Sequence, residues 1–360
     1  MKIIISVPSL TSGSGLSRYV LTLCDILNKD HEIAVLTTHE SNENTFGETA
    51  IHEISPDIKL FKICHSNKLV KYFIALRFIR SYDPDLVINN YNGLIQFILP
   101  LLKKKTKVIH VLHNDTDDFY RIGAINANKT SAWIAPTNAI RDHFNEYTDN
   151  SYADRVSVIS HGVQSGLNHS KESQRLEIVY TGVLYEHKGV KELPEIIKRL
   201  LAKGIDLHFT IIGQGILEDW LKDQFVDEYK SGIVEFTGVI DHNEVYKRMS
   251  KSDIFLYPTH LDAFGLVIAE AMINGAVPVV THLKGVTDNL VNNEKDGFLV
   301  NKGNIEGFID TIKNLYDNPE IIRQISQTAL KKAESLFSMS VMRSNYEIFL
   351  SKAISNKLNT

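Results

Sequence analysis

The sequence predicts an α/β protein in which two doubly wound, mostly parallel β-sheet domains face each other across a cleft. Three observations lead to this fold class. The chain has 360 residues, more than one ordinary core accommodates. Short apolar strands alternate with longer helical patterns along most of its length. The alternation stops once, over the polar, Gly- and Ser-containing residues 160–175, and then starts again.

The expected elements follow in order along the two halves. The first half has strands over Lys2–Val7, Glu32–Leu36, Leu86–Ile88, Val108–Leu112, Ala132–Ala135 and Val156–Ile159, with helices over Leu16–Leu27, Lys68–Ile79 and Thr137–Tyr147. The second has strands over Glu177–Tyr180, Leu207–Ile212, Val234–Phe236, Ile254–Tyr257, Val277–Val280 and Phe298–Val300. We therefore predict an N-terminal domain over residues 1–165, a second domain over 166–335 and a C-terminal helix over 336–360 that packs back on the first domain. Ligands of such sheets bind beyond the carboxyl ends of the strands.

Composition excludes several classes of protein. With 43% hydrophobic and 23% charged residues and a formal charge of −4, the chain is globular and is not a dedicated nucleic-acid binder. Cys24 and Cys64 make neither a disulfide framework nor a metal site, and they indicate buried thiols in a reducing cytosol. No stretch has the ~18 apolar residues of a spanning helix, and the apolar start is too short for a signal peptide. We expect a cytoplasmic protein or one at the cytoplasmic face of a membrane.

The most informative segment runs from Asp262 to Gly275. Residues Phe264–Ile273 are apolar except for Glu270, and a lone carboxylate in a buried helix costs roughly several kcal/mol unless something there requires it. Asp262 is placed to cap the start of this helix, and Gly275 to end it. The pattern indicates a site for a ligand rich in hydroxyl groups, lying against a helix N-terminus.

Two glycine-containing turns of the second half are further candidates. The turn from Gly182 to Gly189 places His187 and Lys188 at an expected helix start, where a cation is favourable if an anion binds. A solvated surface lysine is the alternative. Gly213 and Gly215 follow the next strand, where they either let a ligand approach the backbone or form an ordinary tight connection.

The first half carries weaker signals. The loop Ser12–Arg18, with Gly13 and Gly15, resembles a dinucleotide-binding fingerprint only weakly because its third glycine is missing. A nicotinamide enzyme would also need an acid for the ribose at the end of the second strand, near Thr37–Glu40. With the third glycine missing, this alternative has little support. His113 lies at the carboxyl end of a strand, where it is either a packed, hydrogen-bonded residue or a catalytic one.

No metal constellation stands out in the sequence. Asp115, Asp117 and Asp118 suit either a divalent cation or the capping of a helix, and we expect no metal site. A G-x-S-x-G nucleophile signature is also missing.

In their order and spacing these segments resemble glycosyltransferase family 4, the retaining, nucleotide-sugar-dependent family with two Rossmann-like domains (GT-B). The strongest match is Asp262 to Val279, which has that family's two acids separated by seven residues, followed by Gly275 and Pro278-Val279. Supporting matches are Gly182 with Lys188-Gly189, Ile212–Gly215, Phe236–Ile240, Ser252–Pro258 and Asp296–Val300, and looser ones are Gly13–Gly15, His113 and Ser160–Val163.

The resemblance implies transfer of a hexose from a nucleotide-diphosphate sugar, UDP-linked in the simplest case, with retention and without a metal or another cofactor. The acceptor would be a glycan or a lipid-linked saccharide of bacterial surface polysaccharide or lipopolysaccharide synthesis. Implied catalytic residues are Asp262 on the sugar hydroxyls, Lys188 on the diphosphate and His113 near the reacting sugar. Implied donor-binding residues are Glu270 on the ribose, the backbone of Phe264, Gly265 and Leu266, Gly15 and Leu16 at the phosphates, the turns of Gly182, Gly213 and Gly215, and Val239 and Ile240 beside the base.

Two positions depart from the family pattern. The first acid is usually Glu and here is Asp262, which is one methylene shorter. The residue after the strand-ending glycine is usually Arg and here is Val183, which removes one of two cations expected at the diphosphate. His187 and Arg18 are the candidates to compensate. The departure keeps open a non-catalytic nucleotide-sugar-binding or scaffolding subunit, and a nucleotide-sugar epimerase of the same fold is a further alternative.

Acceptor recognition is expected in the first domain. Asn67–Arg80 is apolar with interspersed cations, and Leu94–Leu102 leads into a lysine-rich stretch that ends at Lys107. Basic and apolar surfaces of this kind suit peripheral contact with an anionic membrane leaflet or a lipid-linked acceptor, whereas ordinary helices packed on a sheet are the alternative.

Overall fold

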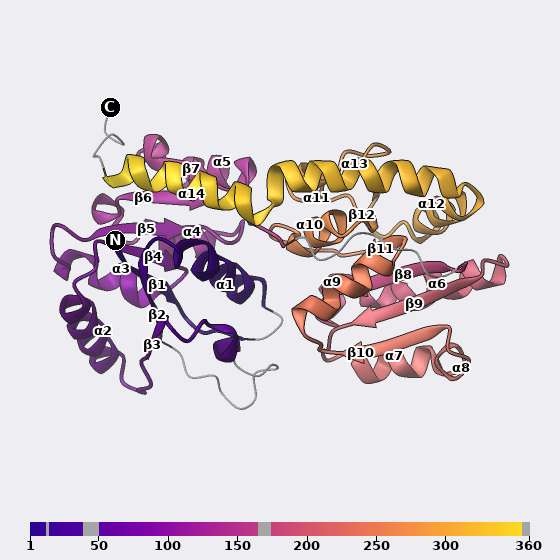
Figure 1. The fold of residues 1–360 in the computed structure, drawn as a ribbon, viewed down its shortest axis with the longest axis horizontal. Helices are drawn as coiled ribbons and strands as arrows, with labels where there is room; N and C mark the ends of the chain where they lie inside the picture. Colours follow the sequence, from indigo (N-terminus) through magenta and orange to yellow (C-terminus); the bar gives the residue numbers. More distant parts are fainter. Residues whose placement is uncertain (12–13, 39–49, 165–173, 355–360) are drawn as a thin grey trace. The chain divides into compact units, whose positions relative to one another are not determined.

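A computed structural model describes residues 1–11, 14–38, 50–164 and 174–354, and its chain divides into two compact units (Figure 1). Unit 1 combines residues 1–162 with the C-terminal stretch from Met339, and unit 2 is Val163–Ser338. Gly13, the sequence around His39–Glu40 and most of the expected linker lie outside the described residues. Each unit is built on one parallel sheet, as the sequence predicts.

Unit 1 has a seven-stranded parallel sheet in the order β3-β2-β1-β4-β5-β6-β7. Its strands are β1 (Lys2–Val7), β2 (Glu32–Thr37), β3 (Lys59–Lys62), β4 (Leu86–Asn90), β5 (Lys107–Val111), β6 (Ala132–Ala135) and β7 (Val156–Val158). Six of the seven agree with the predicted strands within two residues. The sequence missed β3, because this edge strand is only half-buried and has lysine at both ends.

Helices cover both faces of this sheet, because successive side chains of a strand point to opposite faces. Ile3 and Ile5 of β1 pack in one apolar core with α1 (Gly15–Leu27) and α14 (Met339–Ile354), whereas Ile4 packs in another with α2 (Lys68–Tyr82) and α3 (Gly93–Ile98). The hydroxyls of Tyr19 on α1 and Tyr346 on α14 are hydrogen-bonded inside the first core. The remaining helices of the unit are α4 (Asp117–Ala124) and α5 (Asn138–Tyr147).

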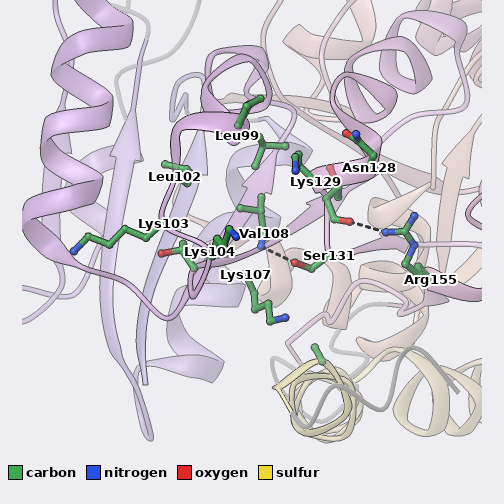
Figure 2. Close-up of a pocket in the computed structure, with 14 residues that line it drawn as sticks. Leu99, Leu102, Lys103, Lys104, Lys107, Val108, Asn128, Lys129, Ser131 and Arg155 are labelled. Atoms are coloured by element: carbon green, nitrogen blue, oxygen red, sulfur yellow. Dashed lines mark hydrogen bonds between the residues drawn. The ribbon is translucent and has the colours of Figure 1, made fainter.

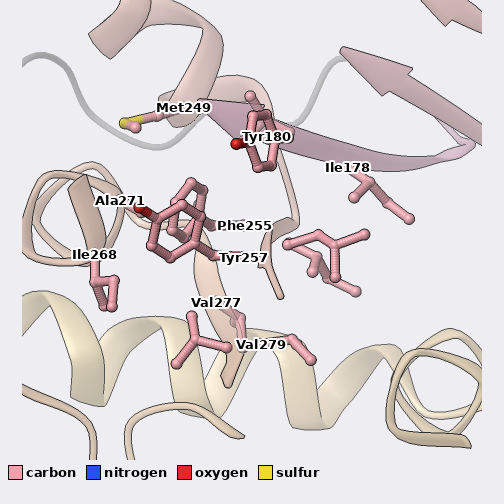
Figure 3. Close-up of a cluster of buried hydrophobic side chains, with 14 of the residues drawn as sticks. Ile178, Tyr180, Met249, Phe255, Tyr257, Ile268, Ala271, Val277 and Val279 are labelled. Atoms are coloured by element: carbon pink, nitrogen blue, oxygen red, sulfur yellow. The ribbon is translucent and has the colours of Figure 1, made fainter. Parts of the chain in front are cut away.

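Unit 2 has a six-stranded parallel sheet in the order β10-β9-β8-β11-β12-β13. Its strands are β8 (Leu176–Thr181), β9 (Leu207–Ile212), β10 (Val234–Gly238), β11 (Ile254–Tyr257), β12 (Val277–Thr281) and β13 (Phe298–Val300). Its helices are α6 (Leu193–Ala202), α7 (Glu218–Gln224), α8 (Val226–Lys230), α9 (His242–Lys251), α10 (Leu266–Ile273), α11 (Thr287–Leu290), α12 (Ile305–Asp317) and α13 (Pro319–Phe337). Figure 3 shows its core, where Tyr180 and Tyr257 of the central strands lie among aliphatic side chains such as Ile178 and Val277.

The strand order fixes where a ligand site forms. In unit 2 the chain runs outward from β8 to β9 and β10, and then returns to β11 beside β8. The loops that follow β8 and β11 therefore leave the sheet in different directions, which opens a crevice at its carboxyl edge. In unit 1 the same reversal lies between β1 and β4. Candidate residues from the sequence analysis follow the strands at both reversals: Lys188 after β8 and Asp262 after β11 in unit 2, and Gly15 after β1 in unit 1.

Three local expectations were wrong. Cys64 is exposed, whereas Cys24 is buried as expected. The helix after Gly182 begins at Leu193, with Pro194 in its first turn, so Lys188 lies in a short 3-10 turn and not at a helix start. The apolar helix that carries Glu270 begins at Leu266, and its N-cap is Gly265, so Asp262 is not the capping residue. Asp262 and the three residues that follow it, up to the cap Gly265, form a turn whose N–H groups are bonded to the Asp262 carboxylate.

Candidate functional site

The candidate site of unit 2 is built where the loops after β8 and β11 meet. The backbone N–H groups of His260 and Leu261 both donate to the carbonyl of His187, at 2.9 and 3.2 Å. A Cβ atom on Gly189 would lie 2.0 Å from the carbonyl oxygen of Pro258, so a glycine is required there. The close approach of the two loops places Lys188 beside Asp262.

Lys188 and Asp262 form a buried ion pair. Lys188 Nζ lies 2.9 Å from Asp262 Oδ2, and the two side chains are only 16% and 15% exposed. The same ammonium donates to the carbonyl of Leu261 at 3.2 Å, and Tyr257 donates its hydroxyl to Asp262 Oδ2 at 2.8 Å. The two residues expected to contact the sugar and the diphosphate thus lie together, already bonded to each other.

The second carboxylate oxygen of Asp262 organises the turn before α10. Asp262 Oδ1 accepts hydrogen bonds from the N–H groups of Ala263, Phe264 and Gly265, at 2.8, 3.4 and 2.9 Å. The amides of Phe264 and Gly265, which the resemblance assigns to the donor, are therefore used by Asp262. The amide of Leu266, at the first position of α10, has no acceptor among the described residues.

Electrostatics keep this site charged but not strongly cationic. Burial disfavours the Asp262 carboxylate, yet the Lys188 ammonium and the hydrogen bonds from Tyr257 and Gly265 hold its pKa below the usual value. Burial and the neighbouring Lys188 charge lower the pKa of His187, so this imidazole is neutral at pH 7. His187 therefore does not supply the cation that is missing at Val183.

Glu270 is buried but not alone. It is 4% exposed, and its Oε1 accepts a hydrogen bond from His242 Nε2 at 2.8 Å and one from the Tyr246 hydroxyl at 3.4 Å. Both partners come from α9, which packs against α10. The sequence reasoning missed His242; its position four residues before Tyr246, on one helix face, was the available signal.

The glycines of the two turns serve close packing. A Cβ on Gly213 would lie 2.0 Å from the carbonyl oxygen of Gly182, and one on Gly215 would lie 2.5 Å from that of Leu184. The turn after β9 therefore lies directly against the turn after β8, and Tyr180 donates its hydroxyl to the carbonyl of Val183 at 3.3 Å. Close packing is therefore sufficient reason for glycine at positions 213 and 215. Approach of a ligand to their backbone would be an additional role. After β10, Val239 is half-exposed, and Ile240 packs partly against the core.

Unit 1 places its candidates at the carboxyl edge of its own sheet. Gly15 is the first residue of α1 and has open space at its Cβ position, and Leu16 follows it. His113 follows β5 and is 8% exposed; its Nε2 lies 3.0 Å from Asn90 Oδ1, and its ring centroid lies 4.8 Å from that of Tyr19. Burial, with His161 and His110 nearby, lowers its pKa well below the usual value, so His113 is neutral at pH 7.

Arg18 and the acidic loop are both engaged in structural contacts. Arg18 lies 3.6 Å from the carboxylate of Glu53, also in unit 1. Asp115 contacts His143 at 2.9 Å and the Tyr120 hydroxyl, and Asp117 and Asp118 occupy the first turn of α4. Within the described parts of the chain, no group of three His, Cys, Asp or Glu residues is arranged to hold a metal ion.

Two family descriptions match consecutive parts of this chain. Residues 13–166 match "Glycosyltransferase Family 4", and residues 168–332 match "Glycosyl transferases group 1". The chain belongs to glycosyltransferase family 4. The predicted family and the predicted GT-B type of fold, with one parallel sheet in each unit, are confirmed.

Curated relatives and solved structures agree with this family. The capsular polysaccharide biosynthesis glycosyltransferase CapM of Staphylococcus aureus is 26% identical over 220 residues, which cover 55% of this chain and 57% of CapM. A glycogen synthase of Mycobacterium tuberculosis is 26% identical over 48% of this chain and 42% of its own. The chain thus spans about half the length of these relatives.

Two other relatives align over nearly their whole length. The Campylobacter jejuni N-acetylgalactosamine-N,N'-diacetylbacillosaminyl-diphospho-undecaprenol 4-alpha-N-acetylgalactosaminyltransferase is 21% identical over 95% of this chain and 97% of its own. The crystal structure of Anabaena Alr3699/HepE in complex with UDP and glucose matches with a TM-score of 0.77 at 17% identity, covering 98% of this chain and all of that one. At this identity the structural likeness shows the fold.

The Lys188–Asp262 pair makes a pH-dependent contribution to stability. Because the folded-state pKa of Asp262 is lowered, the ionised carboxylate stabilises the fold above its unfolded pKa near 4, and that stability is lost as pH falls through the folded pKa. We expect Asp262→Asn to lower the free energy of unfolding by about 2–4 kcal/mol at pH 7, since Lys188 then stays buried without a counter-charge. The difference should shrink in acid, as measured by urea unfolding from roughly pH 3 to 7.

A matched control is Asp206→Asn, which removes an exposed carboxylate of the same unit. It should change the free energy of unfolding by less than about 0.5 kcal/mol at any of these pH values. Equal losses in the two variants, or a loss in Asp262→Asn that does not depend on pH, would contradict the assigned pairing.

Proposed function

We propose that this chain transfers a hexose from a nucleotide-diphosphate sugar, with a UDP-sugar as the expected donor, to a glycan or lipid-linked acceptor with retention of configuration. The observation that carries the proposal is the buried Lys188–Asp262 pair at the crevice of the unit 2 sheet, on the segment that matches the family's acid pair best. In the names of the relatives, CapM makes capsular polysaccharide and the Campylobacter enzyme elongates a diphospho-undecaprenol saccharide. These names support a surface-glycan role.

The proposed chemistry breaks the bond between the anomeric carbon and the diphosphate and forms one to an acceptor oxygen. The acceptor proton passes to the leaving phosphate, whose charge grows as the sugar becomes cationic. Lys188 and the first amides of α10 would stabilise the leaving diphosphate in a site from which water is excluded. Asp262 would hold sugar hydroxyls, and Glu270, oriented by His242, would hold those of the ribose.

The roles proposed for the remaining residues follow the family pattern. Val239 and Ile240 would lie beside the base, and the turns of Gly182, Gly213 and Gly215 would let the nucleotide approach the backbone. Gly15 and Leu16 would contact phosphate, and His113, neutral at pH 7, would act near the reacting sugar as a hydrogen-bonding group. The proposed division gives residues 1–165 to the acceptor and 166–335 to the donor.

A non-catalytic nucleotide-sugar-binding subunit is the second candidate. Val183 stands where the family usually has arginine, and His187 beside it is neutral at pH 7. A single cation would then face a diphosphate that carries at least two negative charges. Binding of the nucleotide without any turnover would favour this alternative.

We expect one nucleotide diphosphate to raise the melting temperature more than the others, with and without EDTA. A hundredfold excess over Kd adds ~2.7 kcal/mol to the free energy of unfolding, so a thermal-shift screen of UDP, GDP and ADP detects a tight site. The shift should be insensitive to EDTA because Lys188 and helix amides take the place of a metal. No shift from any nucleotide would contradict the donor site, and a shift that EDTA abolishes would contradict metal-free binding.

Lys188→Ala should lower turnover by ~10²–10³, by analogy with the loss of one donor to a developing charge. Glu270→Ala should lower it by a similar factor, because the ribose hydroxyls lose their acceptor. The matched control is Lys191→Ala, three residues along the chain, because Lys191 is 48% exposed and pairs with the exposed Glu186. Release of the nucleotide diphosphate during glycan transfer is the measurement, with melting temperatures to establish folding. Turnover near the wild-type rate in a folded Lys188→Ala or Glu270→Ala protein would refute the role of that residue.

Peripheral membrane contact is proposed for one face of unit 1. Leu69 and Phe73 of α2, Phe97 of α3 and the following Leu101 are 53–74% exposed, and the Tyr72 and Phe97 rings, 6.1 Å apart, join the two helices. We call these four residues the apolar stripe. Lys68, Arg77 and Lys104 lie nearby in the sequence and suit an anionic leaflet. Among the described residues no helix is long and apolar enough to cross a bilayer.

Vesicles that contain anionic lipid should therefore retain the protein at low salt, and Leu69→Ser with Phe73→Ser should reduce the bound fraction about fivefold or more, because apolar area is lost. Flotation is the measurement. Ile216→Ser with Tyr229→Ser is the control, since both side chains are about as exposed but lie in unit 2. Failure of the wild-type protein to bind anionic vesicles would remove this proposal.

A further inference from the structure

We propose that a cavity at the amino-terminal edge of the unit 1 sheet binds a phosphate-bearing group. The cavity has a volume of about 480 Å³, which lies in the range of small-molecule sites. Its walls come from residues 99, 100, 102–104 and 106–108, residues 128–131, Arg155 and Ala353 of α14, all within unit 1. Figure 2 shows Lys103 on one side of this group of side chains and Lys129 with Arg155 on the other.

The cavity is separate from the candidate residues at the carboxyl edge. Lys107 is the first residue of β5, Ser131 precedes β6 and Arg155 precedes β7, so three neighbouring strands begin here. His113 follows the opposite end of β5, six residues from Lys107. At about 3.3 Å per residue the two ends lie ~20 Å apart. A ligand in the cavity would therefore be a second ligand of unit 1.

The charge of the lining points to an anion. Lys103, Lys104, Lys107, Lys129 and Arg155 line the cavity, and none of the described lining residues is acidic. The Lys103 ammonium lies 2.7 Å from Asp83 Oδ1. The side-chain ammonium groups of Lys104 and Lys129 have no hydrogen-bond or ion-pair partner in the described structure. Like charges gathered around one cavity repel one another, and a bound anion relieves that repulsion.

Arg155 is held in a fixed position. Its guanidinium lies 4.6 Å from the Tyr152 ring centroid and 5.4 Å from that of Trp133, and its NH1 group donates to the carbonyl of Thr130 at 3.1 Å. A positioned guanidinium presents its remaining N–H groups in a planar fork, which suits the oxygens of a phosphate.

Thr130 adds a buried hydroxyl to the wall of the cavity. It lines the cavity and is 1% exposed, yet its hydroxyl Oγ1 has no hydrogen-bond partner among the described residues. This oxygen has almost no accessible surface, so it reaches a ligand oxygen only when the Thr130 side chain rotates toward the cavity, which would give the buried hydroxyl its partner. The neighbouring Ser131 hydroxyl accepts from the N–H of Val108 at 3.2 Å and keeps its own proton for a ligand.

The same chemistry has two sources, a soluble phosphate or a lipid headgroup. Leu99 and Leu102 form an apolar part of the wall, and the exposed Leu101 of the apolar stripe lies between them in the chain. A lipid headgroup would bind the cations of the cavity while its acyl chains contact the apolar wall. A free phosphate would bind the cations alone.

Trp133 provides a reporter for the test because it lies under Arg155. The chain has two tryptophans, so Trp220→Phe leaves Trp133 as the sole fluorophore in the full-length protein. We would titrate this protein with inorganic phosphate, and separately with vesicles of phosphatidylcholine alone or mixed in equal parts with phosphatidic acid. Lys104→Gln with Lys129→Gln removes two unpaired charges from the cavity. Thr130→Val removes the hydroxyl and keeps the charge. Lys29→Gln with Lys62→Gln, away from the cavity, is the control for net charge.

We expect a saturable change in Trp133 fluorescence, about tenfold weaker in Lys104→Gln/Lys129→Gln, several-fold weaker in Thr130→Val and unaltered in the control. Saturation by inorganic phosphate identifies a soluble ligand, and saturation by phosphatidic acid vesicles alone identifies a headgroup. Equal weakening in the control would show a general charge effect and overturn the proposal. The absence of saturation with every probe, in protein whose melting temperature is unchanged, would overturn it too.

Discussion

The buried ion pair between Lys188 and Asp262 is the interaction on which the rest of the unit 2 site depends. Bringing both charges out of water costs more than their attraction alone returns, so such a pair is poor evidence for stability by itself. Here three backbone amides, the Tyr257 hydroxyl and the Leu261 carbonyl complete the hydrogen bonding of the two groups. The pair thereby joins the loops after β8 and β11 and sets the start of α10. A hydrophobic pair would hold these loops as well, but it would give the crevice no charge.

This arrangement also restricts the chemistry. The carboxylate of Asp262 offsets the charge of Lys188, and His187 is neutral, so the described residues of the crevice carry little net positive charge. A diphosphate that arrived here would compete with Asp262 for the ammonium, and Asp262 would gain freedom to accept from sugar hydroxyls. This exchange of hydrogen-bond partners would couple the diphosphate of a nucleotide sugar to its sugar. Binding of the phosphates and binding of the sugar would then depend on the same two side chains.

Much of the fold, but less of the site, could be read from the sequence. Buried strands such as Ala132–Ala135 and Ile254–Tyr257 are continuous apolar runs, and their bounds are the predicted ones. The edge strand β3 has no such run. Glu270 was identified because an acid is costly in an apolar helix, but its partners His242 and Tyr246 lie on another helix, and periodicity does not show which helix faces which. Gly213 and Gly215 were marked as ligand-approach or turn residues, and only three-dimensional contacts reveal that the Gly182–Leu184 backbone requires them.

The two edges of the unit 1 sheet differ in character for a physical reason. At the carboxyl edge, His113 and Asn90 are buried, and the imidazole stays neutral because no anion offsets the cost of charging it there. At the amino edge, Lys107, Lys129 and Arg155 line a cavity that has no acidic residue among its described lining residues. A neutral, hydrogen-bonding edge suits uncharged hydroxyl groups, such as those of a glycan acceptor. A cationic edge suits phosphate. A lipid-linked acceptor carries both hydroxyl groups and phosphate. Unit 1 would then recognise these two parts of the acceptor at opposite edges of its sheet, one strand length apart.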